Sequence, residues 1–248
     1  MTAWFLSVLA APFIGSFLGV VILRLPAGGA IVWGRSACAS CNHVLGAFDL
    51  FPIASWLALR GRCRYCRAPI GWLTLAVELG ALVVALWAAS ATDGAMLWAS
   101  CALGWVLLAL AAIDFREEWL PDVLTLPLLA GGLLVNGLND PPHLIGCVVG
   151  AMAGFAVFAA IRWAYRRWRG REGLGLGDAK LLAAAGAWLS WESLPSVVLL
   201  AAVIGLAMAL IAAWRGGRSM ALDQQLPFGP ALCAAIWLVW LYGPLVLA

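Results

Sequence analysis

The sequence predicts an all-α polytopic membrane protein with about eight transmembrane helices. Of its 248 residues, 65% are hydrophobic and 11% are charged, whereas roughly 25% are charged in an ordinary soluble domain. The mean hydropathy is +0.98, and the apolar residues gather in runs that approach the length of a bilayer-crossing helix. These observations exclude a water-soluble globule. The net charge of +3 is too small to build a face for duplex nucleic acid, so no nucleic-acid partner is expected, only membrane lipid.

Eight apolar runs are predicted to form the helices. They cover residues 4–23, 72–90, 95–113, 123–138, 143–164, 179–191, 194–214 and 228–247. The runs at 123–138 and 179–191 are short or rich in glycine, so one of them is expected to be tilted or partly re-entrant. No positively charged segment precedes the first run, which is therefore expected to stay as a spanning helix instead of being cleaved as a signal.

The distribution of charge predicts the orientation in the membrane. With eight spans and an external N-terminus, all 15 Lys and Arg residues fall on one side. The short loops on the other side hold only the acids Asp93, Asp140 and Glu192. Because cytoplasmic loops carry the excess of Lys and Arg, the basic side is predicted to be cytoplasmic and both termini to lie outside.

Residues 24–71 form a polar block that is too short for much of a hydrophobic core. Cys38, Cys41, Cys63 and Cys66 form two CxxC pairs with 21 residues between them, a spacing typical of a closed, structural four-thiolate zinc site. Disulfides or free thiols are alternatives, but a cytoplasmic loop is reducing. His43 could also replace one thiolate. The remaining cysteines are expected to pack in apolar runs, and no internal repeat is apparent.

Three aspartates mark a second candidate site. Asp114 follows the run at 95–113, Asp122 comes eight residues later, and Asp178 lies in GLGLGDAK, where Gly175 and Gly177 are expected to give the backbone an irregular path. Two spans separate Asp114 from Asp178, so both lie on the same side at similar depth. Two adjacent carboxylates share a proton, as in aspartic proteases. The alternatives are a helix N-cap for Asp178 and a solvated helix end for Asp114.

Taken together, these motifs resemble the bacterial type IV prepilin peptidases. The resemblance rests on the GxGD of residues 175–178, IDFREEWLPDVLTLP upstream, the four-cysteine block and GSFLGVVILRLP in the first run, and it covers residues 15 to about 190. GxGD alone is shared with other intramembrane aspartyl proteases. The resemblance implies an enzyme of the bacterial inner membrane. It would remove the basic leader from type IV prepilins or type II secretion pseudopilins and then methylate the new N-terminus with S-adenosylmethionine.

The resemblance also implies roles for individual residues. Asp114 and Asp178 would be the proteolytic pair, with Asp122 as the alternative to Asp114. Gly175, Gly177 and Lys180 would support them. The acids Glu117, Glu118 and Asp122 could attract the basic leader, although such a cluster is equally typical of a solvated helix end.

Glu78 matches an acid linked to methyl transfer in this family, and its alternative is a buried structural carboxylate paired with Arg24 or Arg67. The chain departs from the family pattern at Ala39, where Pro is usual, at Gly19, where Asn is usual, and in GWLTLAVE, which lacks an Arg-Tyr-Pro segment. These departures bear on methylation more than on cleavage. The expected domains are the first helix at 1–23, a methyltransferase-associated zinc domain at 24–71 and a peptidase domain at 72–248.

Two other classes of function fit parts of the sequence. One is a proton-coupled transporter, and the other is a non-enzymatic zinc-knuckle scaffold of a secretion assembly. Transporters usually hold their charged residues near the bilayer midplane, whereas these aspartates cluster at one membrane face. The sequence indicates no oligomeric state.

Overall fold

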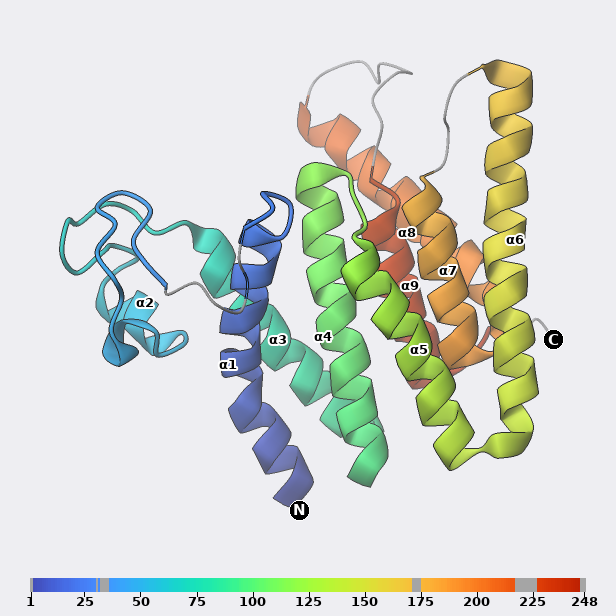
Figure 1. Ribbon diagram of the computed structural model, residues 1–248, viewed down its shortest axis with the longest axis horizontal. Coiled ribbons are helices and arrows are strands. Elements are labelled where there is room, and N and C mark those ends of the chain that lie inside the picture. Colours follow the sequence, from blue (N-terminus) through green and yellow to red (C-terminus); the bar gives the residue numbers. More distant parts are fainter. Residues whose placement is uncertain (1, 30, 32–35, 171–174, 217–226, 246–248) are drawn as a thin grey trace. The chain divides into compact units, whose positions relative to one another are not determined.

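The computed structural model describes residues 2–29, 31, 36–170, 175–216 and 227–245, and all the secondary-structure elements named in this part of the chain are helices (Figure 1). The all-α prediction is thus confirmed. The elements in chain order are α1 (Thr2–Arg24), η1 (Ala47–Asp49), α2 (Ala54–Ala58), α3 (Trp72–Ala91), α4 (Gly94–Glu117), α5 (Asp122–Asn139), η2 (Pro141–His143), α6 (Leu144–Arg169), α7 (Leu176–Leu189), η3 (Trp191–Ser193), α8 (Leu194–Gly216) and α9 (Gly229–Tyr242).

Each of the eight predicted apolar runs contains one helix, and six helices among the described residues are long and apolar enough to cross a membrane. The other two, α7 and α9, have 14 residues each, or about 21 Å of helix against a hydrocarbon core of about 30 Å. The run predicted at 228–247 is shortened because Gly243 adopts a left-handed φ of 83° and Pro244 follows it. The structure therefore supports a multi-pass membrane protein with six candidate spans.

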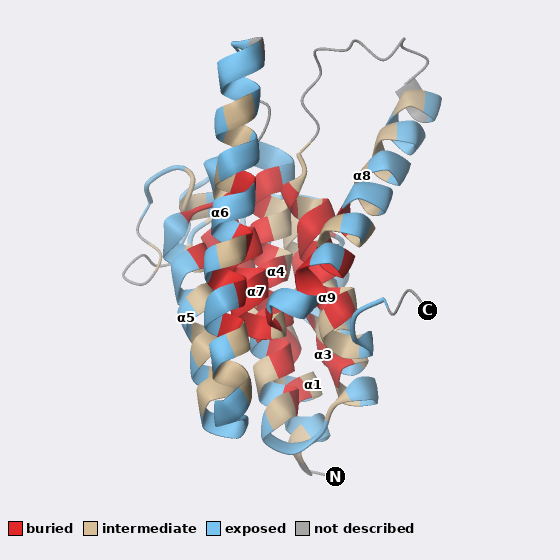
Figure 2. Ribbon diagram, turned by 90° about the vertical axis from the view of Figure 1, so that its right-hand side faces the viewer, coloured by how far each residue is buried: buried red, intermediate tan, exposed pale blue. Residues whose placement is uncertain are grey.

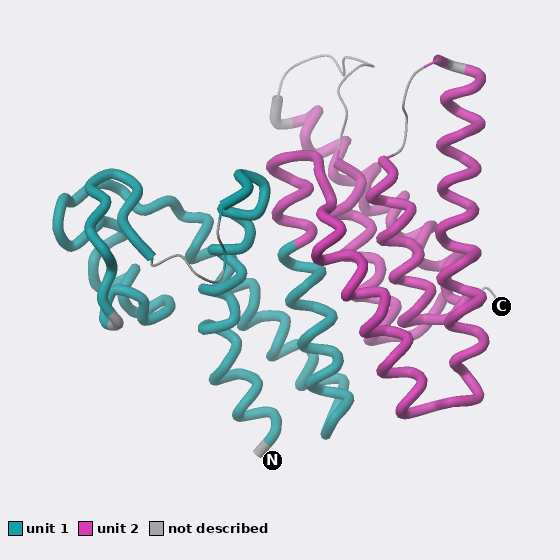
Figure 3. Tube along the Cα trace, viewed as in Figure 1, with its two compact units in different colours: residues 1–109 teal, residues 110–248 magenta. Residues whose placement is uncertain are grey.

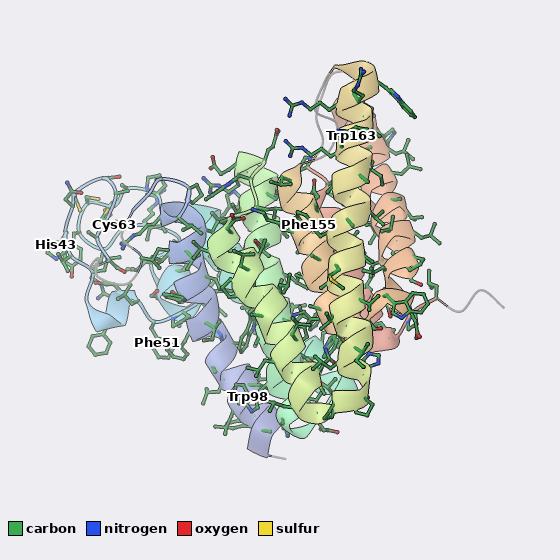
Figure 4. All side chains as sticks on the ribbon, turned by 45° about the vertical axis from the view of Figure 1, so that its right-hand side comes forward. His43, Phe51, Cys63, Trp98, Phe155 and Trp163 are labelled. Atoms are coloured by element: carbon green, nitrogen blue, oxygen red, sulfur yellow. The ribbon has the colours of Figure 1, made fainter. Side chains whose placement is uncertain are left out.

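The chain forms two compact units, residues 1–109 and 110–248, with the boundary inside α4 (Figure 3). In the first unit α1 crosses α3 closely, because a Cβ added to Gly15 would lie 2.6 Å from the Cα of Glu78. The indole N–H of Trp105 in α4 donates to the carbonyl of Ala81 in α3 at 3.0 Å. The loop between α1 and α3 also contacts α1, where the rings of Phe51 and Phe13 meet edge to face (Figure 4).

In the second unit α7 is the central helix, and it packs against α5, α6 and α9. Nearly all of its residues from Asp178 to Trp188 are buried (Figure 2). A short helix that is apolar all round is expected in such a buried position. Although α7 is shorter than the hydrocarbon core is thick, longer helices of the same unit, α5 and α6, pack against it.

Small residues bring α6 and α7 into backbone contact. Gly146, Gly150 and Gly154 recur every four residues along one face of α6, and a Cβ on any of them would collide with α7 or the segment that follows it. Such spacing of small residues is typical of tightly packed membrane helices. On the opposite side of α7, the Asn136 side chain of α5 donates to the carbonyls of Ala187 and Trp188. The glycine contacts with α6 and the hydrogen bonds from α5 together hold α7 in position.

Candidate active site

Asp178 lies in the first turn of α7 and is buried, with 8% of its surface exposed. Its Oδ2 accepts the backbone N–H of Gly175 at 3.2 Å, so the carboxylate caps the start of its own helix from the third position. The helix-capping role expected as an alternative for Asp178 is therefore observed, although Asp178 caps from the third position of α7 and the N-cap residue itself is Gly175. This bond to Oδ2 does not involve Oδ1, the other carboxylate oxygen of Asp178.

Asp114 lies in the last turn of α4, which continues past the predicted end at residue 113 to Glu117. Its side chain is 6% exposed, and Oδ2 accepts the backbone N–H of Gly229, the first residue of α9, at 3.0 Å. Asp114 and Asp178 lie close enough for their charges to interact. Both carboxylates also interact with the buried thiol of Cys233 in α9. The structure thus brings the two predicted aspartates into one buried site, and Asp114 is not a solvated helix end.

Asp122 occupies a different environment. Its side chain is 54% exposed at the start of α5, and its Oδ1 accepts a hydrogen bond from the Lys180 ammonium at 2.6 Å. Lys180 lies two residues after Asp178, so its side chain projects from roughly the opposite side of α7. Asp122 and Lys180 therefore form an ion pair between α5 and α7 outside the buried site.

The two glycines of GxGD have different surroundings, and Gly177 is the one required for space. Gly175 has an extended backbone with φ of −68°, which any residue can adopt. A Cβ on Gly177 would lie 2.7 Å from the Cβ of Leu120, in the connection between α4 and α5. The helix α7 already begins at Leu176, so Gly177 is helical, and it allows α7 to approach Leu120. The irregular path expected ahead of the helix falls on residues 171–174, which lie outside the described residues.

The four cysteines of the loop between α1 and α3 form a cluster, and their sulfur atoms all lie within 4.8 Å of one another. The Sγ atoms of Cys38 and Cys66 are 3.7 Å apart, and two ligands on a tetrahedral zinc with Zn–S bonds of about 2.3 Å would be about 3.8 Å apart. Hydrogen bonds from the N–H groups of Cys41 and Ser40 lower the pKa of the Cys38 thiol to about 6, which favours the thiolate that binds metals. These residues fit zinc, and the cysteines are not joined in disulfides.

An internal repeat, which the sequence analysis missed, builds the cluster. The N–H groups of Cys38 and Cys63 donate to the carbonyls of His43 and Ala68, and those of Asn42 and Arg67 donate back to the two cysteines. Each turn closes with one isolated antiparallel bridge, Ala37 to Val44 and Arg62 to Pro69. Every partner in the second turn lies 25 residues after its counterpart in the first. The signal in the sequence is the aligned pair SACASCNHVLG and GRCRYCRAPIG.

Side chains also join the second turn to η1 and to the first turn. Arg64 donates from Nε to Asp49 Oδ1 at 2.7 Å, and the Tyr65 hydroxyl donates to Oδ2 of the same carboxylate at 3.3 Å. The His43 ring lies 3.6 Å from that of Tyr65 and outside the sulfur cluster, which is built from cysteines alone (Figure 4). Arg64 is thus paired with Asp49.

Glu78 in α3 is a buried acid of the first unit, with 4% of its surface exposed. Its Oε2 accepts the backbone N–H of Ile53 at 2.7 Å, and it also interacts with the Ser16 hydroxyl of α1. Ile53 has a left-handed φ of 59°, which is strained for a β-branched residue. Glu78 therefore joins α3, α1 and the cysteine loop, and the partners observed for its carboxylate are the loop N–H of Ile53 and the Ser16 hydroxyl.

Comparisons with known proteins match both units. Residues 9–92 match the bacterial peptidase A24 N-terminal domain, and residues 101–210 match the type IV leader peptidase family. A prepilin leader peptidase/N-methyltransferase of Burkholderia pseudomallei is 45% identical over 89% of this chain and 79% of its own length. One from Aeromonas hydrophila is 42% identical over 93% and 87%, and one from Dickeya chrysanthemi is 40% identical over 94% and 90%. The chain belongs to the bacterial prepilin leader peptidase/N-methyltransferase family. No solved structure matches it significantly.

Membership of this peptidase and methyltransferase family confirms the predicted enzyme class and decides against the transporter and scaffold alternatives. The matched N-terminal domain contains the four cysteines and Glu78, and the matched peptidase region contains both buried aspartates. Gly229 lies beyond the matched residues, and sequence reasoning did not single it out. The signal that could have found it is a glycine between two prolines in Pro227-Phe228-Gly229-Pro230.

Proposed function

We propose that Asp114 and Asp178 are the catalytic pair that hydrolyses the leader of type IV prepilins or type II secretion pseudopilins. The observation that carries this proposal is their burial in one site at the ends of two helices, each held by one backbone N–H. Buried carboxylates at membrane depth are costly and mark functional sites. The exposed, ion-paired Asp122 lacks these properties.

The proposed reaction follows the chemistry of a carboxylate pair. One aspartate, ionised, takes a proton from a water molecule as the water oxygen bonds to the scissile carbonyl carbon. The other, protonated, gives its proton to the carbonyl oxygen. Collapse of the tetrahedral species breaks the C–N bond, and the amine of the mature pilin leaves with a proton. Burial strengthens these charge interactions because water is largely excluded.

We further propose that this site faces the cytoplasm at the edge of an inner membrane. All 15 Lys and Arg residues fall on that side when eight segments are threaded, with α7 and α9 as shorter segments inside the bundle and both termini outside. The exposed acids Glu117 and Glu118 at the end of α4 would attract the basic leader of the substrate. The apolar part of the substrate would then lie in the lipid.

Methylation of the new N-terminus is assigned to the loop of residues 24–71 together with Glu78. Zinc on the four cysteines would fix the loop, whose turns bury little apolar surface. S-adenosylmethionine would supply the methyl group, and its positive sulfonium suits the buried carboxylate of Glu78. Glu78 would hold the strained Ile53 segment in place for this step. Residues 1–23, 24–71 and 72–248 would then be the first helix, the zinc domain and the peptidase domain, with α3 at the start of the last domain contributing Glu78 to methylation.

The test is mass spectrometry of a prepilin expressed together with the full chain, scoring both loss of the leader and the mass gain of one methyl group. Asp114→Asn and Asp178→Asn are each expected to reduce leader removal by at least about 10³-fold. Asp140→Asn, at an exposed aspartate on the opposite side of the membrane, is the matched control and should process normally. Normal processing by either Asp114→Asn or Asp178→Asn would remove that residue from the mechanism.

A further inference from the structure

The start of α9 contacts Asp114 from a distant part of the chain. The N–H of Gly229 donates to Asp114 Oδ2 at 3.0 Å across 115 residues of sequence. Both residues are buried, so water does not compete for this bond. This bond from the start of α9 is the hydrogen bond observed at the Asp114 carboxylate among the described residues.

The small size of Gly229 also matters to Asp114. A Cβ at this position would lie 2.5 Å from Asp114 Oδ2 and 2.8 Å from Cγ, closer than real Cβ atoms approach other atoms. The φ of Gly229 is not among the left-handed values of the chain, so glycine is not needed for its backbone conformation. Glycine is needed here because the carboxylate occupies the space of a side chain.

The surrounding residues hold this donor in a fixed place. Pro230 restricts the first turn of α9 and has no N–H of its own, so it leaves Gly229 as the donor at this point. The ring of Phe228 packs against Phe158 of α6, with ring centroids 6.4 Å apart. A helix start also presents partial positive charge to a carboxylate. The donor is therefore rigid before any substrate binds.

We propose that Gly229 is a positioning residue of the peptidase site. Its N–H sets the orientation of the Asp114 carboxylate by holding Oδ2, and its missing side chain leaves that carboxylate its place. Oδ1 of Asp114 is then the oxygen available for proton transfer. This inference rests on the proposed role of Asp114 in cleavage and adds α9 to the elements that build the site.

The first experiment measures leader removal by purified full-length enzyme. Gly229→Ala is expected to lower kcat about 10²-fold, because small displacements of a catalytic group cost about that much, while KM for the prepilin stays within about twofold. Methylation of a substrate from which the leader has already been removed should continue at the wild-type rate. The matched control is Gly205→Ala in α8, where the added Cβ would meet its neighbours at 3.7 Å or more. Wild-type kcat in Gly229→Ala, or equal loss of cleavage and methylation, would overturn the inference.

A second measurement remains decisive if Gly229→Ala folds poorly. Its effect on Tm is compared in the wild type and in Asp114→Ala, which removes the carboxylate that the new Cβ would meet. Most of the loss of Tm should disappear in the Asp114→Ala background, as expected for two residues in contact. An equal loss in both backgrounds would contradict the inference.

Failure of the inference can be told apart from failure of the proposed catalytic pair. If Asp114→Asn is inactive while Gly229→Ala cleaves normally, only the role of Gly229 is wrong. If Asp114→Asn itself cleaves normally, the proposed pair is wrong, and the positioning of Asp114 loses its function with it.

Discussion

Asp114 and Asp122 are eight residues apart in the chain and have opposite environments in the structure. Asp114 faces the interior from the last turn of α4, whereas Asp122 begins α5 on the surface and pairs with Lys180. The sequence left both as candidates because their roles depend on where α4 ends. The additional turn of α4 to Glu117 places Asp114 on the helix and separates the two environments.

This difference predicts unequal effects of two similar substitutions. Asp122→Asn removes an exposed ion pair worth about 0–1 kcal/mol, so leader removal should stay within about threefold of the wild type. The ratio of mature to unprocessed pilin on a gel measures this. The double variant Asp122→Lys with Lys180→Asp restores an ion pair and serves as the control. Loss of processing in Asp122→Asn as severe as in Asp114→Asn would show that Asp122 takes part in the reaction.

At the scale of elements, the packing of α6 on α7 depends on the glycines along one face of α6. A Cβ at Gly150 would lie 2.7 Å from the backbone nitrogen of Trp191 and 2.8 Å from the carbonyl oxygen of Gly186. Backbone atoms cannot move aside as a flexible side chain can. The spacing of these glycines is visible in the sequence, but which helix they face is set by long-range packing.

Gly150→Ala should therefore destabilise the protein by about 1–3 kcal/mol through overpacking. Helix propensity alone would favour alanine by up to about 1 kcal/mol. Gly131→Ala in α5 is the control, since its Cβ would meet Trp188 at an ordinary 3.7 Å. Thermal unfolding in detergent compares them, and a Tm for Gly150→Ala equal to that of Gly131→Ala would refute the close contact between α6 and α7.

The loop of residues 24–71 predicts a response to metal removal. Zinc should be found by elemental analysis of the purified protein, and its removal by a chelator should lower Tm and reduce methylation, because a structural metal contributes directly to folding. Cys63→Ser should reproduce both effects. His43→Ala is the control and should keep the metal, since His43 lies against Tyr65 outside the sulfur cluster. Protein that contains no zinc, or His43→Ala without metal, would contradict this four-cysteine site.

At the scale of the whole molecule, local patterns in the sequence predicted most of the architecture. The apolar runs and the CxxC pairs each lie within a short stretch of chain, and the structure has eight helices and a sulfur cluster at those places. The lengths of α7 and α9 were not predictable in this way, because burial of α7 among other helices and the Gly243-Pro244 break decide them. The contact of Gly229 with Asp114 joins segments too far apart for a local pattern to indicate.

We propose that the two units divide the two activities between them. The buried aspartates and Gly229 lie in residues 110–248, whereas Glu78 and the four cysteines lie in residues 1–109. Each unit has its own buried acidic residues and its own hydrogen bonds to hold them. Substitutions in one unit are therefore expected to remove one activity and leave the other.

The most direct test measures both activities of Asp178→Asn and Glu78→Gln with two substrates, an intact prepilin and the same protein without its leader. Asp178→Asn should fail to cleave the first substrate and should still methylate the second. Glu78→Gln keeps an acceptor for the Ile53 N–H, so it should cleave the first substrate normally and add no methyl group to either. Loss of both activities together in either variant, at an unchanged Tm, would contradict the account.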